Sequence, residues 1–147
     1  MIYLSTGAWN VAPTLMRFLR RHVFPPGAML LTDWGPTHDR WFRSGRQHKA
    51  KNLARLAEEF PDIKWLLIGD DGQHDDALYT AFAAEHPDRV AAVAIRRLSA
   101  TEAVLAGGRT VVDDHSAAGV PWVTDSDGAG LLDRLADVGV VEPDPPA

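Results

Sequence analysis

The sequence predicts an α/β fold, a three-layer, Rossmann-like parallel sheet with helices on both faces. Short apolar runs typical of buried strands alternate with segments whose apolar residues recur every three or four positions. That alternation is typical of strand–helix–strand units and a parallel sheet. No repeat or linker interrupts the pattern over 147 residues. We therefore expect one domain, residues 1–141, and a disordered proline-containing tail, 142–147.

The first half of the chain is expected to contain three strands and two helices. The first strand starts at Ile2, at the very beginning of the sequence. Asn10 is a good helix cap, and Pro13 suits the first turn of the helix that follows. The aperiodic segment 33–45 is expected to be a loop, and Pro61 to end the second helix. The expected strands are 2–4, 28–32 and 64–68, and the second helix covers 48–60.

The second half is expected to continue the alternation. Asp75 or Asp76 opens a helix, and a β-branched, apolar strand follows at 90–95. A weaker pattern then predicts a short helix at 101–106, an extended piece at 110–112, a strand at 121–124 and a helix at 130–138. Trp9 and Trp65 are expected in the core.

Composition excludes several classes of function. The formal net charge is −5, which argues against nucleic acid as the main partner. The absence of cysteine excludes disulfides, thiolate catalysis and Cys-based zinc sites. No apolar stretch approaches the ~20 residues that span a bilayer, and the N-terminus lacks signal-peptide features. We therefore expect a cytoplasmic protein. No Gly-rich loop follows the first strand, which argues against nucleotide binding.

An acidic turn follows the third expected strand. The run Leu66-Leu67-Ile68 ends in Gly69-Asp70, and Asp75 follows five residues later. Open α/β folds bind ligands at the carboxyl ends of their strands, and two carboxylates there can hold Mg²⁺ through oxygen. A turn that caps the next helix explains the same residues, so the pattern alone leaves both interpretations open.

Polar side chains also follow the first two expected strands. Ser5 and Thr6 follow the first strand, and Asp33 follows the second. In one parallel sheet these residues share an edge with Asp70, so we expect them to converge. Beside Gly7, hydroxyl and backbone N–H groups can bind a phosphate oxygen. Turn formation and helix capping explain Ser5 and Thr6 when each is considered alone.

Two lysines stand near the expected start of the second helix. Lys49 and Lys51 are two of only three lysines in the chain. A cation at a helix N-terminus opposes the helix dipole, at a cost of up to about 1 kcal/mol. The placement indicates a use for the charge, such as binding phosphate. A solvated surface position is the alternative for at least one of them.

Together these residues resemble a known superfamily. A hydroxyl residue, a lysine at a helix start and Gly-Asp with a later Asp resemble the second, third and fourth motifs of the haloacid dehalogenase-like phosphatases. The segments 3–10, 24–27, 31–35 and 67–75 are similar to the catalytic domain of the actin-patch-type phosphatidate phosphatases, and the likeness covers roughly residues 2–100. The resemblance implies a haloacid dehalogenase-like fold without a large cap, Mg²⁺ as cofactor, and phosphatidate or a related phosphomonoester as substrate.

The resemblance also implies roles for the phosphate-binding residues. Ser5 would bind a phosphoryl oxygen, with Thr6 beside it. Lys49 would stabilise the charge on the nucleophile and the phosphate, and Lys51 is the substitute candidate.

For the metal, the resemblance implies that Asp70 binds Mg²⁺ and that Asp75 supports or joins it. Asp71 stands where a small hydroxyl residue is expected. Asp71 and Asp33 are weaker candidates for the site.

The first motif of the superfamily, a strand ending in Asp-x-Asp that carries the nucleophile, is expected before residue 1. The chain is thus expected to be truncated at its N-terminus and inactive alone. It is either a piece of a longer protein or a short relative that binds phosphate and metal without turnover. Asp125-Ser126-Asp127 also has the Asp-x-Asp pattern. A circular permutation would make it the nucleophile motif, whereas a turn that caps the last helix is the simpler explanation.

Aromatic residues stand beside basic ones in the segment between the second and third motifs. Trp34, Trp41 and Phe42 lie among arginines at 40, 43 and 46. This combination suits peripheral contact with an anionic membrane. The edge of a hydrophobic core with solvated arginines explains it as well.

Overall fold

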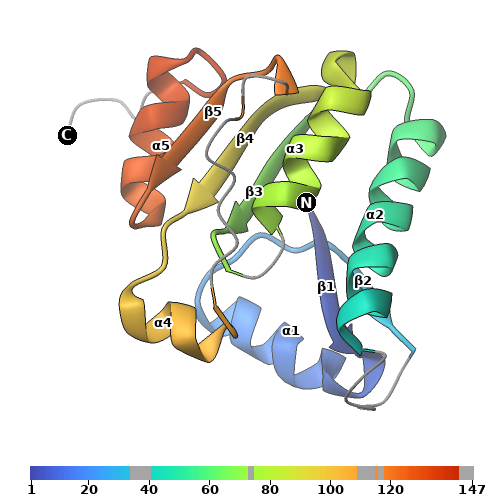
Figure 1. Cartoon of the computed structure of the whole chain (residues 1–147). Helices are drawn as coiled ribbons and strands as arrows, with labels where there is room; N and C mark the ends of the chain where they lie inside the picture. The colour runs from blue at the N-terminus through green and yellow to red at the C-terminus, as the bar shows by residue number, and fades with distance from the viewer. Residues whose placement is uncertain (34–40, 73–74, 109–114, 116–117, 143–147) are drawn as a thin grey trace. The chain divides into compact units, whose positions relative to one another are not determined.

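The computed structural model describes residues 1–33, 41–72, 75–108, 115 and 118–142, without the side chains of 41–44. The chain divides into two compact units, Met1–Glu59 and Phe60–Ala147, which we describe one at a time. All described strand pairs are parallel and alternate with helices, so the α/β class is confirmed (Figure 1). The described strands form two hydrogen-bonded sheets, whereas the sequence predicted one.

The first unit is built on a two-stranded parallel sheet. Strand β1 (Ile2–Ala8) pairs with β2 (Ala28–Thr32), and the register shifts between Leu4 and Ala8. A single 3-10 turn, η1 (Trp9–Val11), leads into α1 (Ala12–Arg21). The long helix α2 (Trp41–Glu59) contacts both strands. The polar residues that follow Leu4 therefore lie in the irregular second half of β1 and not beyond its end.

Three expectations for the first unit are wrong. Helix α1 is capped at Val11 and not at Asn10, because the 3-10 turn takes up Asn10 before the helix begins. Trp9, expected in the core, is 48% exposed. The segment predicted as a loop over 33–45 is helical from Trp41 onward, so α2 begins seven residues earlier than the apolar periodicity indicated.

The second unit contains the three-stranded sheet β3-β4-β5, whose strands lie side by side and parallel (Figure 1). The predicted elements are found here within two residues of their expected ends. The expected extended piece at 110–112 and the tail beyond Glu142 lie outside the described residues. The elements are β3 (Trp65–Asp70), α3 (Asp75–Glu85), η2 (Pro87–Arg89), β4 (Val90–Arg96), α4 (Ala100–Leu105), β5 (Trp122–Asp125) and α5 (Gly128–Asp137).

Helices cover both faces of this sheet. Leu131 and Leu135 of α5 pack on one face, in a buried cluster with Ala92, Ala94 and Val123. Because strand residues alternate between faces, the neighbouring positions point to the other side. There α3 contacts β3 and β4. The predicted three-layer arrangement is therefore present within the second unit.

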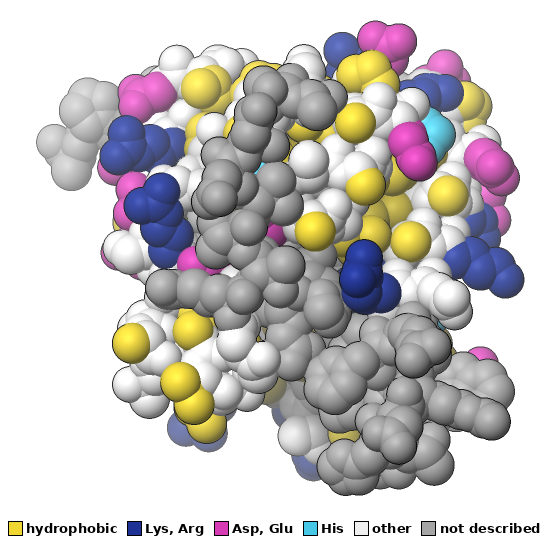
Figure 2. All heavy atoms as spheres, in the orientation of Figure 1, with side chains coloured by type: hydrophobic (Ala, Val, Ile, Leu, Met, Phe, Trp, Pro, Cys, Tyr) yellow, Lys and Arg dark blue, Asp and Glu magenta, His cyan; other side chains and the backbone are white. Residues whose placement is uncertain are grey.

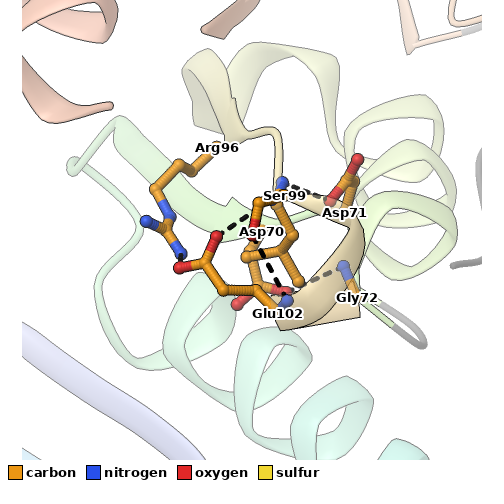
Figure 3. A network of polar contacts seen from close by, with 7 residues as sticks. Asp70, Asp71, Gly72, Arg96, Ser99 and Glu102 are labelled. Carbon is orange, nitrogen blue, oxygen red and sulfur yellow. Dashed lines mark hydrogen bonds and ion pairs between the residues drawn. The ribbon is translucent and has the colours of Figure 1, made fainter. Parts of the chain in front are cut away.

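Helix α4 is held by a complete capping box at its N-terminus (Figure 3). The backbone N–H of Ser99 donates to Glu102 Oε2 at 2.9 Å, and the backbone N–H of Glu102 donates to Ser99 Oγ at 3.3 Å. Arg96 at the end of β4 donates to Glu102 Oε1 at 2.7 Å. The Ser99 N–H and then Arg96 lower the pKa of Glu102 to about 2.

The surface carries charges of both signs. Figure 2 shows basic and acidic side chains interspersed over the described part of one face. None of the helices in the described ranges is long and apolar enough to cross a bilayer.

Leu131→Ala tests the core of the second unit. The leucine is 6% exposed, and its neighbour Leu132 in the same helix is 38% exposed. We expect Leu131→Ala to lower the free energy of unfolding by about 2–5 kcal/mol, since a buried leucine leaves a cavity. Leu132→Ala should cost far less. Urea denaturation of the two variants measures this difference, and equal losses would contradict the packing described for α5.

The capping box predicts an acid-sensitive contribution to stability. The Glu102 pKa lies at about 2, below its ordinary value of 4.5. A depressed carboxyl pKa stabilises the fold fully above the ordinary value, and the contribution is lost as pH falls from there toward about 2. NMR titration of the Glu102 carboxyl should show the low midpoint in the wild type and a higher one in Arg96→Ala. An ordinary wild-type midpoint would contradict the box.

Candidate functional site

Asp70 lies at the carboxyl end of β3, where the chain turns toward α3. Its Oδ1 atom accepts a hydrogen bond from the Gly72 N–H at 2.8 Å, which closes a turn two residues long (Figure 3). The side chain is half-buried. Among the described residues no group donates a hydrogen bond to Asp70 Oδ2, so one carboxylate oxygen is available to a ligand.

Asp75 is brought back onto the same strand end by α3. A Cβ atom added to Gly69 would lie 3.0 Å from Asp75 Oδ2 and 2.9 Å from Tyr79 Cε2. Such contacts are too short, so α3 can approach β3 this closely only over a glycine. The close approach sets the carboxylate of Asp75 against the residue that precedes Asp70.

Tyr79 connects the two carboxylates to the interior. Its hydroxyl donates to the Ile68 carbonyl oxygen at 3.2 Å, and the residue is 8% exposed. Burial raises the pKa of Tyr79 well above its ordinary value, and the negative charges of Asp75 and Asp70 raise it further. Both carboxylates therefore lie close enough to the phenol to affect it, and Tyr79 stays a neutral hydrogen-bond donor.

The donor set of this strand end fits a small hard cation. Mg²⁺ is commonly held by one or two carboxylates, with water or phosphate oxygens completing its shell. Asp70 and Asp75 supply two such groups. Within the described residues, no group of three or more His, Asp or Glu side chains is placed to hold a metal ion. A metal site here would thus consist of the two carboxylates, with further oxygen ligands supplied by water, phosphate or other atoms.

Asp71 has a different set of contacts from its neighbour. It is 7% exposed, and its Oδ1 accepts the Leu98 N–H at 2.8 Å. Its own N–H donates to the Arg96 carbonyl oxygen at 3.0 Å. Figure 3 shows this carboxylate directed to the segment after β4. The buried carboxylate thus fixes that segment beside the acidic turn, a role that the sequence pattern did not reveal.

The predicted phosphate-binding hydroxyls lie in the first unit. Ser5 Oγ accepts the Gly7 N–H at 3.1 Å, so this N–H, expected to be exposed, is bonded within the turn. The buried Thr32 hydroxyl donates to the Thr6 carbonyl oxygen at 3.1 Å and thereby joins the ends of β1 and β2. Asp33 follows β2 and is exposed. Ser5, Thr6 and Asp33 thus belong to one two-stranded sheet, whereas the predicted shared sheet with Asp70 is not found among the described strands.

Lys49 lies well inside α2 and not at its start. The helix begins at Trp41, so the argument from the helix dipole was wrong for both Lys49 and Lys51. Lys49 is half-buried and Lys51 is exposed. Two polar neighbours in α2 had no predicted role: His48 Nε2 lies 3.4 Å from the Leu30 carbonyl oxygen, and Asn52 donates to the His48 carbonyl oxygen at 2.8 Å. Their i, i+4 spacing was the available signal.

The structure brings the predicted residues together in two groups. Ser5, Thr6 and Asp33 belong to the sheet of the first unit, and Asp70 and Asp75 share the strand end in the second. Convergence of the two groups at one site stays a prediction. The side chains of Trp34, Trp41 and Phe42 lie outside the described residues.

The second Asp-x-Asp sequence has structural contacts for both of its carboxylates. Asp127 caps α5, because its Oδ1 accepts the Gly130 N–H at 2.9 Å. Asp125 accepts the Ser126 N–H at 2.7 Å and lies 3.4 Å from Arg134; the Ser126 N–H and Arg134 lower its pKa. The capping interpretation is confirmed for Asp127. An open cavity of about 720 Å³ adjoins Asp125, and Arg97 and Trp122 line it.

Known proteins resemble the N-terminal two thirds of the chain. The family described as "Phosphatidate phosphatase APP1, catalytic domain" matches residues 1–97. Phosphatidate phosphatase APP1 of Saccharomyces cerevisiae is 34% identical over 74 residues, which are 50% of this chain and 13% of the yeast protein. An uncharacterised protein of Schizosaccharomyces pombe is 26% identical over 95 residues, 64% of this chain and 16% of that protein.

The chain thus spans less than a fifth of the length of these curated relatives. No solved structure matches it. The family match extends over well more than half of the chain and includes both groups of predicted site residues. The chain therefore belongs to the family of the phosphatidate phosphatase APP1 catalytic domain.

Proposed function

We propose that this chain forms the phosphate- and metal-binding part of a Mg²⁺-dependent phosphatase for phosphatidate or a related phosphomonoester. One observation carries the proposal. In a member of this family, Asp75 is packed against Gly69 beside Asp70 at the carboxyl end of β3. Two carboxylates at one strand end supply oxygen ligands of the kind that Mg²⁺ takes. The name of the yeast relative supports the substrate class.

Asp70 and Asp75 would hold the cation. A bound Mg²⁺ would offset the negative charge of a phosphate at the strand end. The chain's own contribution is rigidity. The turn closed by the Gly72 N–H orients Asp70, and the hydrogen bond from Tyr79 to the Ile68 carbonyl oxygen fixes the first turns of α3 against β3. Asp75 is thereby kept over Gly69.

Ser5, Thr6 and Lys49 would bind the phosphate. The Ser5 hydroxyl can donate to a phosphoryl oxygen while its own oxygen accepts the Gly7 N–H. A lysine supplies a compact positive charge for a phosphate or a carboxylate. In this proposal Lys49 has that role, and Lys51 and Asp33, both exposed, are secondary.

The nucleophile completes the proposal. Phosphoryl transfer to a carboxylate requires an aspartate placed in line with the phosphate. Neither Asp70 nor Asp75 is assigned to this step, since both are assigned to the cation. We propose that the aspartate comes from a strand ending in Asp-x-Asp, encoded upstream of Met1. The protein would act in the cytoplasm, at a membrane surface where its phospholipid substrate lies.

The proposed substrate places the protein at a lipid surface, so peripheral contact is part of the proposal. Trp34, Trp41 and Phe42 stand among arginines in the sequence. Aromatic and basic residues together favour an anionic interface.

Asp70→Asn tests the metal site in the 147-residue chain. We expect the variant to lose affinity for Mn²⁺, used as a spectroscopic substitute for Mg²⁺, by about tenfold or more, because one of two charged ligands is removed. Asp88→Asn, an exposed carboxylate in η2, is the matched control and should bind as the wild type does. Electron paramagnetic resonance of free Mn²⁺ measures both. Equal binding by Asp70→Asn and wild type would refute the metal site.

The nucleophile is tested by extending the chain upstream in its own reading frame. We expect release of phosphate from an aryl phosphate in the presence of Mg²⁺ by the extended protein only. In that protein Lys49→Ala should lower the rate by about 100-fold, as for loss of one charge-stabilising donor, and Lys51→Ala should change it little. Binding of metal and phosphate by the extended chain without release of phosphate would identify a non-catalytic binding domain instead.

A further inference from the structure

Helices α4 and α5 end in the same hydrogen-bond pattern. After α5, the Gly139 N–H donates to the Ala136 carbonyl oxygen at 2.9 Å, and the Val140 N–H donates to the Leu135 carbonyl oxygen at 2.9 Å. Gly107 and Gly108 repeat this pattern after α4. It requires a left-handed residue just past the cap, which is usually glycine. Gly107 and Gly139 occupy that position with φ of 87° and 72°.

Helix α1 ends in the same pattern with a valine in the glycine position. The Val23 N–H donates to the Arg20 carbonyl oxygen at 3.2 Å, and the Phe24 N–H donates to the Leu19 carbonyl oxygen at 2.9 Å. Val23 has φ of 59° and is the one described non-glycine residue with positive φ. A β-branched residue is strained there. Its side chain is 89% exposed, so packing does not offset the strain.

The residues around Val23 are also apolar and exposed. Phe18 is 52% and Phe24 is 49% exposed, and their ring centroids lie 6.5 Å apart. Met16 on the same helix is 43% exposed. Backbone strain that presents an apolar side chain to solvent is a reason to expect a function for that side chain.

The charges along this segment of the chain are positive. Arg17, Arg20 and Arg21 lie in α1, and no Asp or Glu precedes Asp33, in a chain whose net charge is −5. None of the three arginines forms an ion pair with a carboxylate in the described ranges. We name the α1 tip as Phe18, Val23 and Phe24 together with Arg17, Arg20 and Arg21.

We infer that the α1 tip docks on the surface of a membrane containing anionic phospholipid. The three apolar side chains would enter the interface, and the arginines would meet lipid phosphates. A membrane offers an apolar interior beneath a negative surface, which matches both halves of the tip. The exposed side chains of α4, over which Figure 2 shows yellow atoms, lack this match, because α4 contains no basic residue. The choice of lipid rests on the proposed function; the docking itself does not.

The variant Val23→Gly distinguishes an effect on membrane binding from an effect on folding stability. Glycine relieves the strain, so we expect the melting temperature to rise by about 2–4 °C. We expect co-sedimentation with vesicles of phosphatidylcholine and phosphatidylserine to fall by about tenfold, since one buried apolar side chain is lost from the interface. The matched control Gly139→Val places the same residue in the same position after α5. It should lower the melting temperature and leave vesicle binding unchanged.

Replacement of Arg20 and Arg21 by glutamine should weaken vesicle binding, and binding should fall when phosphatidylserine is omitted or salt is raised. Unchanged binding by Val23→Gly, or equal binding to vesicles without anionic lipid, would overturn the inference. A dimer in light scattering that Val23→Gly dissociates would assign the tip to a protein interface and would also overturn it. Asp70→Asn should still bind vesicles, so failure of the metal site and failure of membrane docking are distinguishable.

Discussion

The acidic strand end depends on the close approach of α3 to β3 over Gly69. With any side chain at that position, Tyr79 and Asp75 would have to withdraw from the strand. Tyr79 would then lose its hydrogen bond to the Ile68 carbonyl oxygen, and the start of α3 would no longer be fixed. One missing Cβ atom therefore sets how closely Asp75 approaches the end of β3. The start of α3 is fixed there by apolar packing and by the hydrogen bond of a phenol that burial keeps neutral.

The same arrangement explains which features could be predicted from the sequence. Strands β2, β3 and β4 are continuous apolar runs, and burial in a parallel sheet is the simplest way to hide them. Asp70 follows from β3 because a carboxylate directly after a buried strand must lie at the sheet edge. The position of Asp75 could be predicted because an acidic residue is expected at the start of a helix. Both positions are determined by neighbouring residues in the sequence, and the periodicity of apolar residues predicts such local features well.

Features that depend on contacts far apart in sequence were not predicted. The first two turns of α2 lack apolar periodicity, so nothing local marked Trp41 as a helix start, and the dipole argument for Lys49 failed with it. The buried role of Asp71 requires the Leu98 N–H, 27 residues away. The left-handed conformation of Val23 is visible only in the backbone, so no sequence pattern indicated it. Membership of the family was recognised from short motifs, and the division of the chain into two compact units was not.

The hydrogen bond between Asp71 and Leu98 bears on where this domain can be cut. The family match ends at residue 97, one residue before the N–H that Asp71 accepts. A chain trimmed to the family boundary would remove a donor from a buried carboxylate, at a cost of about 1–3 kcal/mol. It would also discard β5, which pairs with the edge of β4, and α5, which packs on one face of the sheet. The segment that matches the family is therefore shorter than the segment that packs together as one folded unit. Fragments of longer relatives should be designed to include the whole folded unit.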